Sequence, residues 1–555
     1  MTTIKLELGE WIYNAGIVGL CNILEHSHDE IIIENDYVEF DDSILENFEN
    51  KYFKYLIDTY EPVLSYSKIL NIEDFIIKHK NEDFENFSNE NLEYLNKYIA
   101  DVLKYYLKSN SYKAAYPLID SNVDILALEK SISKVSKKKT ENIEDIKENL
   151  VDVFNKIEEV LNFIKLEDSK KYLAGKNIVY NIIRNGWDGV SFLNRATKEK
   201  DFYIDYGNYF VEPVVDYLEA DKSKYKYTCF TCNREMKNFN NDISFVNNLG
   251  FDVARKSAHV WNFDNDIAVC PVCKLVLSCI PAGFTYIFDK GIFINDNINI
   301  ESLIRTNNKL MTMLDYEVDN KSYGTNKALV KALFNANVRA VRNELQDIQV
   351  IRLIDGDYKF NILTKSVLNI INDSKEDLEK IESTGYKEIN SYFYIYNIVL
   401  DNILNNRNMY LLIEKLLHYK ISKNSNLFYN TSHIIRVLKI NNRYLREVEV
   451  LSKEQEGLIQ EANKQGYFLR QAYKEKGSVD KLNGIAYRLL NALKISNISM
   501  FMDTILNSYL YTKKQVPKII VESQKDIDIF KTMGYSFIAG LIEGVEYNTE
   551  GNYDK

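Results

Sequence analysis

Two cysteine pairs constrain this chain more than any other feature of its sequence. Cys229 and Cys232 form one CxxC motif, Cys270 and Cys273 form a second, and together they account for four of the 6 cysteines among 555 residues. A CxxC turn directs two thiolates at one ion, and two such turns complete the tetrahedral sulfur shell of a structural Zn²⁺ site. Four thiolates leave no open position for a reacting water, so the pattern predicts a structural zinc site and not a catalytic one.

The two pairs are further apart than the pairs of a compact zinc ribbon. Residues 233–269 separate them, whereas about 15–20 residues are typical. We interpret the extra length as an insertion between two zinc knuckles, which together span residues 222–285. A redox-active CxxC motif and a chance pairing are the alternatives. Either His259 or Cys279 remains open as a replacement for one thiolate ligand.

The composition predicts a soluble protein that is rich in long helices. Hydrophobic residues make up 46% of the chain and charged residues 27%, which is ordinary for a globular protein. Only 6 prolines interrupt 555 residues, and proline is the residue that most disrupts a helix. No run of about 18 apolar residues occurs, and the start, Met1–Glu7, lacks the basic and apolar regions of a signal peptide. We therefore expect a cytoplasmic protein without membrane contact, whose thiols are reduced or metal-bound.

The net charge of −11 is unevenly distributed along the chain. Residues 1–100 carry 21 acidic and 7 basic side chains, so the rest of the chain has a slight positive excess. Residues 451–521 alone hold 11 basic and 6 acidic side chains. A solvated helix face explains such an excess, and so does a nucleic-acid-binding surface that occupies only part of the protein.

The spacing of apolar residues predicts an α+β fold that is mostly helical. Helical periodicity dominates from residue 48 to residue 163 and again beyond residue 323, while glycines next to aromatic residues between them indicate turns and strands. The predicted regions are an N-terminal α+β region (1–167), an α+β region with the zinc knuckles (168–318), a helical region (319–449) and a C-terminal four-helix bundle (450–546).

The start of the chain gives clear local predictions. Lys5–Leu8 reads as a short strand, and an apolar helix follows from about Trp11 to Glu25. Two alternating apolar segments then flank Glu34–Asp36, which predicts a β-hairpin. In the middle region, Ile280–Phe284 combines proline, glycine and phenylalanine, and we expect turns and strands there.

The C-terminal bundle is predicted from helix-capping signals and apolar spacing. Ser452–Gln455 fits a capping box that opens the first helix, and Gly477 ends it. Two more helices follow, the second of them with Leu510 on its expected apolar face. Pro517 breaks the pattern, and the last helix begins near Asp526. The short connections predict an antiparallel four-helix bundle.

Catalytic motifs are almost absent from the sequence. It contains no phosphate-binding loop, no dinucleotide-binding fingerprint and no serine-hydrolase motif. His26, His28, Asp29 and Glu30 imitate a metal or His–Asp nuclease site, but they lie in the most acidic stretch of the chain, and no second His–Asp element follows. We interpret the cluster as a solvated turn and expect no enzymatic activity. A zinc-containing nuclease that uses this cluster is the alternative.

Basic and amide side chains near the cysteine pairs and in the bundle are candidates for nucleic-acid contacts. Amines and guanidinium groups pair with phosphates, while asparagine amides read base edges. Solvated side chains without a ligand are the alternative in both regions. The candidates near the cysteines are Arg234, Lys237, Asn238, Asn240, Arg255 and Lys256, and those in the bundle are Arg470, Lys474, Lys476, Arg488 and Lys494.

An ordered set of short motifs resembles one protein family across most of the chain. That family is the large subunit of the type I-B CRISPR surveillance complex (Cascade), in its zinc-knuckle branch. The wide spacing of the two knuckles is the one departure from its simple pattern. The motifs that carry the resemblance are Gly9–Ile17, Gly189–Asn194, the two CxxC pairs, Ile280–Phe284, Leu482–Lys494, Phe501–Asp503 and Phe537–Leu541.

The resemblance implies a non-catalytic subunit that recognises nucleic acid. Such a subunit sits at the end of the complex that holds the 5′ handle of the guide RNA. It contacts the protospacer-adjacent motif in target double-stranded DNA, aids strand opening and recruits a separate helicase–nuclease in antiviral defence. Its other implied partners are the backbone, handle-binding and small subunits, and its C-terminal bundle is small-subunit-like. A zinc-stabilised scaffold without direct DNA contact remains a further alternative.

Overall fold

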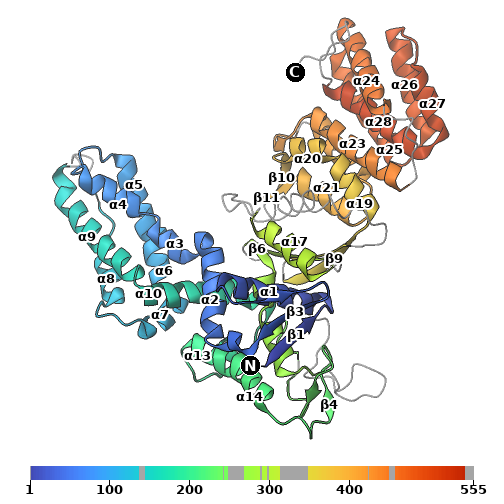
Figure 1. Cartoon of the computed structure of the whole chain (residues 1–555). Coiled ribbons are helices and arrows are strands. Elements are labelled where there is room, and N and C mark those ends of the chain that lie inside the picture. The colour runs from blue at the N-terminus through green and yellow to red at the C-terminus, as the bar shows by residue number, and fades with distance from the viewer. Residues whose placement is uncertain are drawn as a thin grey trace. The chain divides into compact units, whose positions relative to one another are not determined.

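The computed structural model of the protein divides into two compact units (Figure 1). Residues 1–319 and 351–359 form the first unit, and residues 320–350 and 360–555 form the second. Both units are mainly helical with small sheets, which confirms the predicted fold class. No helix in the described part of the chain is long and apolar enough to cross a membrane. The structure describes residues 2–136, 144–241, 243–247, 268–287, 290–296, 299–312, 348–354, 356–422, 424–448 and 457–543.

The first unit is built around one buried helix, α1 (Trp11–His26). Twelve consecutive residues of this helix are buried. Two short helices, α15 (Pro271–Ser278) and α16 (Ile280–Gly283), pack against it at backbone distance. A Cβ atom at Gly283 would lie 1.9 Å from the carbonyl oxygen of Ala15, so only glycine fits at this crossing. Helix α1 therefore fixes the position of the segment that follows the second cysteine pair.

The predicted strand, helix and hairpin at the start of the chain are confirmed. Strand β1 (Thr3–Glu7) pairs antiparallel with β3 (Tyr37–Asp41), which also pairs antiparallel with β2 (Ile32–Ile33). The N–H of Glu34 donates a hydrogen bond to the carbonyl oxygen of Tyr37 at 2.9 Å and closes the hairpin. The alternation of buried and exposed residues along β1 and β3 places one face of this sheet on the core.

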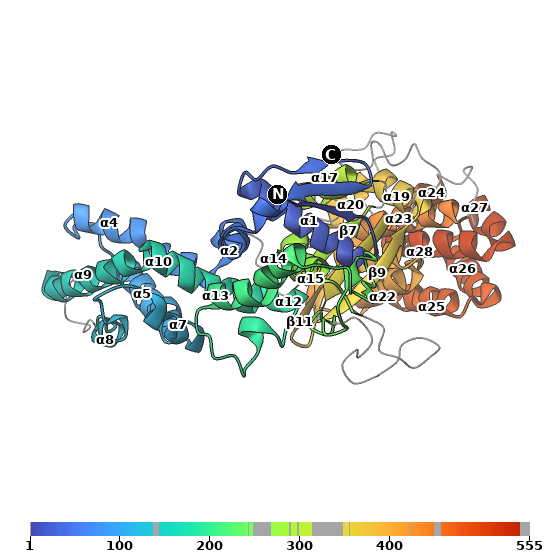
Figure 2. The same cartoon turned by 60° about the horizontal axis from the view of Figure 1, so that its bottom comes forward.

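Helices form most of the first unit between residues 48 and 219, and the apolar spacing predicts them as far as residue 163. Helices α4, α5, α8 and α9 gather at one end of this unit in Figure 2. The helices are α2 (Phe48–Tyr60), α3 (Ser65–Leu70), α4 (Glu73–Asn81), α5 (Asn89–Tyr98), α6 (Lys104–Leu107), α7 (Asn110–Ala115), α8 (Ile125–Ser131), α9 (Lys147–Ile164), α10 (Glu167–Ser169), α11 (Gly175–Ile178), α12 (Arg184–Gly186), α13 (Phe202–Tyr206) and α14 (Glu212–Glu219).

One prediction for the middle region is wrong in detail. The segment from Ile280 to Gly283, expected to form turns and strands, is the short helix α16, because its small residues pack against α1. Strand β6 follows directly. The sheet that it opens has the order β6-β7-β8-β9. Its strands are β6 (Thr285–Ile287), β7 (Lys290–Asn295), β8 (Ile348–Ile354) and β9 (Asp357–Leu363), and α17 (Ile300–Thr312) lies between β7 and β8 in the chain.

The region from 319 to 449, predicted to be helical, also contains strands. Strands β10, β11 and β12 form a sheet of order β11-β10-β12. Each has only two to four residues, which is too short to leave a recognisable alternation in the sequence. The elements are α19 (Lys365–Asp373), α20 (Lys375–Ile381), β10 (Gly385–Glu388), β11 (Ser391–Tyr394), α21 (Ile395–Leu404), α22 (Tyr410–Ile421), β12 (Leu427–Phe428) and α23 (Thr431–Glu447).

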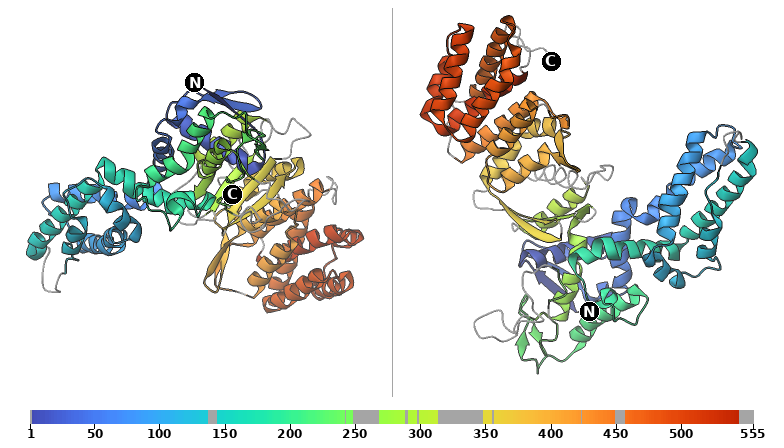
Figure 3. Two further views of the ribbon diagram at one scale, coloured as in Figure 1. Left: turned by 90° about the horizontal axis from the view of Figure 1, so that it is seen from below. Right: turned by 180° about the vertical axis from the view of Figure 1, so that it is seen from behind.

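The C-terminal helices pack against one another and form the orange and red end of the chain in Figure 3, with the short helix α27 added to the four that the sequence predicts. Gly477 has φ +64° and ends the first of them, as expected. Leu510 does not lie on an apolar face, because it is 73% exposed and the buried side of its helix centres on Ile505 and Tyr509. The predicted capping box at Ser452–Gln455 lies outside the described residues. The helices are α24 (Leu458–Glu475), α25 (Leu482–Lys494), α26 (Ile498–Thr512), α27 (Lys518–Glu522) and α28 (Ile527–Glu543).

The crossing of α24 and α28 yields a stability prediction. A Cβ atom at Gly540 would lie 2.0 Å from the carbonyl oxygen of Asn463. Gly540→Ala must therefore separate the two helices, and we expect a loss of about 1–3 kcal/mol in the free energy of unfolding of this unit. Urea unfolding monitored by hydrogen exchange in peptides from α24 and α28 measures the loss.

Gly484→Ala is the matched control for this substitution. No atom lies within 4 Å of a Cβ at Gly484, which is exposed within α25. Alanine is favoured over glycine by about 1 kcal/mol inside a helix, so this variant gains stability. Equal stability of the two variants would contradict the close approach of α24 and α28.

Candidate metal centre

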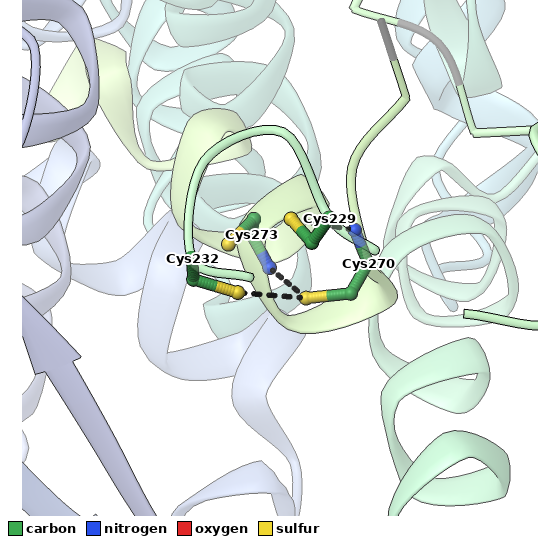
Figure 4. Close-up of side chains that lie close together, drawn as sticks. All are labelled: Cys229, Cys232, Cys270 and Cys273. Carbon is green, nitrogen blue, oxygen red and sulfur yellow. Dashed lines mark hydrogen bonds between the residues drawn. The ribbon is translucent and has the colours of Figure 1, made fainter. Parts of the chain in front are cut away.

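The four cysteines of the two CxxC pairs meet at one point in the first unit (Figure 4). Their Sγ atoms all lie within 4.8 Å of one another, and the Sγ atoms of Cys232 and Cys270 are 3.6 Å apart. Sulfurs about 2.3 Å from a tetrahedral zinc ion are separated by about 3.8 Å, so the spacing fits such a site. Among the residues that the structure describes, this is the only group of metal-ligating side chains so arranged.

The first knuckle is a turn at the tip of a two-stranded ribbon. Strands β4 (Tyr227–Thr228) and β5 (Glu235–Met236) pair antiparallel on either side of Cys229 and Cys232. The N–H of Cys229 donates to the carbonyl oxygen of Arg234 at 2.8 Å. These backbone contacts tighten the turn, so both sulfurs point to the same side.

The second knuckle lies at the beginning of a helix. Cys270 caps α15, Pro271 occupies its first turn, and the Sγ atom of Cys270 accepts a hydrogen bond from the N–H of Cys273 at 3.5 Å. The Sγ atom of Cys229 accepts a further bond from the N–H of Cys270 at 3.2 Å. Backbone N–H donors and the positive end of the helix dipole both favour thiolates over thiols.

The long insertion does not separate the knuckles, because its two ends are tied together. The N–H of Phe230 donates to the carbonyl oxygen of Ala268 at 3.0 Å, and the N–H of Val269 donates to that of Asn241 at 2.9 Å. Both bonds lie directly beside the cysteines. The residues that begin and end the insertion therefore lie side by side next to the cysteines.

The four thiols influence one another's ionisation. Hydrogen bonds from the other three cysteines hold the pKa of Cys229 well below its ordinary value. Hydrogen bonding to that thiolate, together with burial, raises the pKa of Cys273 well above its ordinary value. Without a metal ion, therefore, some of the sulfurs ionise readily and others keep their protons. A divalent cation that binds all four sulfurs stabilises the fully ionised state.

Arg234 lies beside the sulfurs instead of facing solvent. Its guanidinium donates a hydrogen bond to the carbonyl oxygen of Lys5 in β1. Burial lowers the pKa of Arg234, but the charges of Cys232 and the neighbouring thiolates outweigh burial and raise it overall. The side chain therefore places a positive charge next to the cysteine cluster, and the phosphate contact expected from the sequence stays a prediction.

Tyr13 is a site residue that the sequence did not single out. Its hydroxyl and the Sγ atom of Cys273 are hydrogen bonded at 3.4 Å. The Cys273 thiol is the donor of this bond, and burial, followed by the charge of Cys273, raises the pKa of Tyr13 well above its ordinary value, so the phenol keeps its proton. The residue lies in the Gly9–Ile17 motif, which was the available signal. It connects the cluster to helix α1.

The remaining cysteines lie outside the cluster. Cys279 belongs to the core, where burial raises its pKa to about 12 and its Sγ atom donates to the carbonyl oxygen of Leu275 at 3.4 Å. The structure thus gives no support to Cys279 as a replacement ligand, and His259 lies outside the described residues. Cys21 is fully buried on α1, as its apolar neighbours predict.

Three of the nucleic-acid candidates near the cysteines are exposed together. Lys237, Asn238 and Asn240 lie in the loop that follows β5. The Oδ1 atom of Asn238 accepts a hydrogen bond from the N–H of Asn240 at 3.1 Å, which fixes the loop and leaves the amide nitrogen of Asn238 to solvent. Lys237 has no ion pair with the described residues. Arg255 and Lys256 lie outside the described residues.

The candidates in the bundle divide into two groups. The guanidinium of Arg470 donates to the carbonyl oxygen of Ile542, and the amine of Lys476 donates to that of Tyr511. The Nζ atom of Lys494 is 3.1 Å from the Glu414 carboxylate. The other two, Lys474 and Arg488, are exposed and have no ion pair with the described residues.

The histidine cluster near the start of the chain is held by neighbouring side chains. The Nε2 atom of His26 lies 3.3 Å from the carboxylate of Asp58. The Nζ atom of Lys51 lies 2.9 Å from the carboxylate of Asp29. Within the described residues these side chains do not converge as a metal site.

Comparison with known proteins supports the interpretation of the two CxxC pairs as one module. Residues 222–285 match the model of a family described as CRISPR-associated protein (Cas_CXXC_CXXC). The match covers both CxxC pairs and the insertion between them, and it indicates a CRISPR-associated protein. No curated protein and no solved structure matches the chain.

The geometry predicts that the purified protein carries about one zinc ion per chain. Cys270→Ser removes one ligand and one helix-capping sulfur, so we expect loss of the metal and faster hydrogen exchange across residues 222–285, since metal binding and local folding are linked. Elemental analysis and hydrogen exchange provide the two readouts. Cys279→Ala, outside the cluster, keeps its zinc. Protein purified without chelator and found free of zinc would contradict the site.

A second prediction separates the role of Arg234 from that of its neighbour. Arg234→Gln removes the positive charge beside the thiolates, and we expect zinc to be lost to a competing chelator about 10–100-fold more readily. Lys237→Gln makes the same change in charge three residues away, on an exposed side chain, and leaves zinc retention unchanged. Equal zinc retention in both variants would show that Arg234 does not support the site.

Proposed function

We propose that this chain is the non-catalytic large subunit of an RNA-guided type I-B CRISPR surveillance complex. In that role it recognises the protospacer-adjacent motif in duplex DNA, aids strand opening and recruits the helicase–nuclease in antiviral defence. The observation that carries the proposal is the match of residues 222–285 to a CRISPR-associated family, in which the two CxxC pairs close on one point. The ordered motifs elsewhere in the chain support the same assignment.

The proposed metal is zinc, with Cys229, Cys232, Cys270 and Cys273 as its four ligands. Four sulfurs saturate the ion, so its contribution is to hold the knuckles in place and not to activate water. Helix α1 contacts the site through the hydrogen bond between Tyr13 and Cys273. A rigid base of this kind is what a loop needs if it is to read DNA with fixed geometry.

The proposed reading loop is the one that follows β5. Lys237 contacts a phosphate, while the amides of Asn238 and Asn240 reach base edges in a groove of the duplex. The protein then reads only a short signal in the duplex, and base pairing with the guide RNA reads the remaining sequence. The proposed partners are therefore the 5′ handle of the guide RNA, the target DNA, the other Cascade subunits and the helicase–nuclease, in the cytoplasm.

A zinc-containing nuclease that uses the His26–Glu30 cluster is the second candidate. It is less well supported, because the side chains of His26 and Asp29 are paired with Asp58 and Lys51. A nuclease predicts metal-dependent cleavage by the isolated chain. The large-subunit proposal predicts no cleavage by the isolated chain.

Assembly tests the proposal. Co-expression of the full chain with the backbone and handle-binding subunits and a guide RNA is expected to yield one stable ribonucleoprotein on size-exclusion chromatography. That particle binds a target duplex tightly only when the adjacent motif is present, as measured by gel shift. Failure to associate, together with metal-dependent cleavage by the chain alone, would favour the nuclease.

Substitutions in the reading loop make the prediction specific. In the assembled complex, Lys237→Ala weakens binding to all duplexes and lowers the salt slope by about one. Asn238→Ala or Asn240→Ala instead reduces the preference for the correct motif, with a cost of about 1–3 kcal/mol in discrimination. Lys113→Ala, an exposed lysine elsewhere in the first unit, leaves both properties unchanged. Equal effects at all four positions would show that another surface of the protein reads the DNA.

A further inference from the structure

The four sulfurs of the metal centre belong to side chains that differ in their exposure to solvent. Cys229 is 1% exposed, and Cys270 and Cys273 are fully buried. Cys232 differs from them, because its side chain is only partly buried. Phe230, in the same turn, is 59% exposed. A reagent in solution therefore reaches Cys232 before it reaches the other three cysteines.

The accessible cysteine contacts a buried cysteine of the other knuckle. The Sγ atom of Cys232 lies 3.6 Å from the Sγ atom of Cys270 (Figure 4). As metal ligands both side chains are thiolates, which is the form of cysteine that acts as a nucleophile. Cysteines that respond to oxidants are accessible thiolates with a second cysteine close enough to complete a disulfide. Cys232 and Cys270 meet each of these conditions.

Contacts that involve no metal ion also keep the two knuckles side by side. The N–H of Phe230, within the first CxxC turn, donates to the carbonyl oxygen of Ala268 at 3.0 Å. The N–H of Cys270 donates to the Sγ atom of Cys229 at 3.2 Å. Loss of a metal ion therefore leaves Cys232 and Cys270 within reach of each other.

Arg234 places a cationic donor beside the accessible sulfur. One nitrogen of its guanidinium donates to the carbonyl oxygen of Lys5, while Nη1 is buried and has no hydrogen-bond partner among the described residues. Burial lowers the pKa of Arg234, and the charge of Cys232 is the largest of the influences that raise it. A cationic donor without a partner stabilises negative charge that passes from sulfur to oxygen during oxidation.

Two cysteines of the same unit provide an internal comparison. Cys21 and Cys279 are fully buried in the core. Burial raises the pKa of Cys279 to about 12 and raises that of Cys21 well above its ordinary value, so both thiols keep their protons. Buried thiols of this kind are inert. Reactivity is therefore expected at the metal centre and not at these two residues.

We propose that Cys232 is a site of reversible oxidation by hydrogen peroxide and that the product is a disulfide between Cys232 and Cys270. The Cys232 thiolate attacks one oxygen of the peroxide, so an S–O bond forms, the O–O bond breaks and hydroxide leaves. The Cys270 thiolate then attacks the sulfur of the resulting sulfenic acid. An S–S bond forms, the S–O bond breaks and a second hydroxide leaves. The two sulfurs together lose two electrons, which the peroxide gains.

The disulfide removes two of the four sulfur ligands. The sulfurs of Cys229 and Cys273 remain, which are too few for a structural zinc site with four ligands. We therefore expect oxidation to release zinc and to loosen residues 222–285, because metal binding and local folding are linked. A dithiol reductant together with Zn²⁺ restores the reduced site. This inference requires the zinc site but not the proposed role in a CRISPR complex.

The test uses the zinc-loaded full chain, treated with increasing concentrations of hydrogen peroxide. A colorimetric chelator follows the release of zinc, and mass spectrometry of alkylated, unreduced peptides maps the disulfide bonds. We expect one zinc ion to be released for each Cys232–Cys270 disulfide that forms, while Cys21 and Cys279 stay reduced. Dimedone labels sulfenic acids, and when it is present during oxidation we expect the first label at Cys232.

Cys232→His separates oxidation from the loss of a ligand. Histidine is also a zinc ligand, so this variant forms a site of three cysteines and one histidine and keeps its zinc before oxidation. It lacks the accessible sulfur, and we expect its release of zinc by peroxide to be at least about tenfold slower than in the wild-type protein. Cys279→Ala is the matched control, because it removes one cysteine outside the cluster and releases zinc at the wild-type rate.

The labels and the rates can each overturn the proposal. Zinc retained by the wild-type protein after peroxide has oxidised Cys21 or Cys279 would do so, as would a first dimedone label on a cysteine other than Cys232. Equal rates of zinc release from Cys232→His and the wild-type protein would also contradict it. A disulfide within one CxxC pair would show that Cys270 is not the second cysteine. If Cys232→His binds no zinc, the label and the disulfide map of the wild-type protein decide alone.

Discussion

Four cysteine sulfurs lie within 4.8 Å of one another, so it is costly to ionise all of them unless a cation lies between them. Hydrogen bonds hold one sulfur as a thiolate and oppose ionisation of another. A divalent ion bound by all four sulfurs would resolve the conflict and join two chain segments that lie far apart in sequence. Because the second knuckle is also the beginning of α15, such an ion would orient a helix as well as two turns. Metal binding and local folding would then be coupled.

The helix that begins at the metal centre is anchored at its other end. The carbonyl oxygen of Ser278 accepts hydrogen bonds from the indole of Trp187 at 3.0 Å and from the hydroxyl of Tyr52 at 3.1 Å. Gly283, just beyond it, contacts the backbone of α1. The cysteine module is thus held by buried polar contacts and by close backbone packing.

The sequence predicted those features that depend on local spacing. The convergence of the CxxC pairs follows from their motif, and the end of α24 follows from Gly477, because such signals act within a few residues. Features that depend on tertiary contact were missed. The hydrogen bond from Arg234 to Lys5 in β1 has no signal in the sequence, and Leu510 reads as buried until α26 is oriented by its neighbours. Tyr13 has no signal beyond its place in a motif, since its partner Cys273 is distant in sequence.

We propose that this chain works on a guide RNA within a larger complex. Sequencing the RNA that copurifies with the tagged full chain from its native cells tests that claim most directly. We expect enrichment of short RNAs that share one constant 5′ end and differ in the sequence that follows. Absence of enriched RNA, or enrichment of RNA without a common 5′ end, would contradict it.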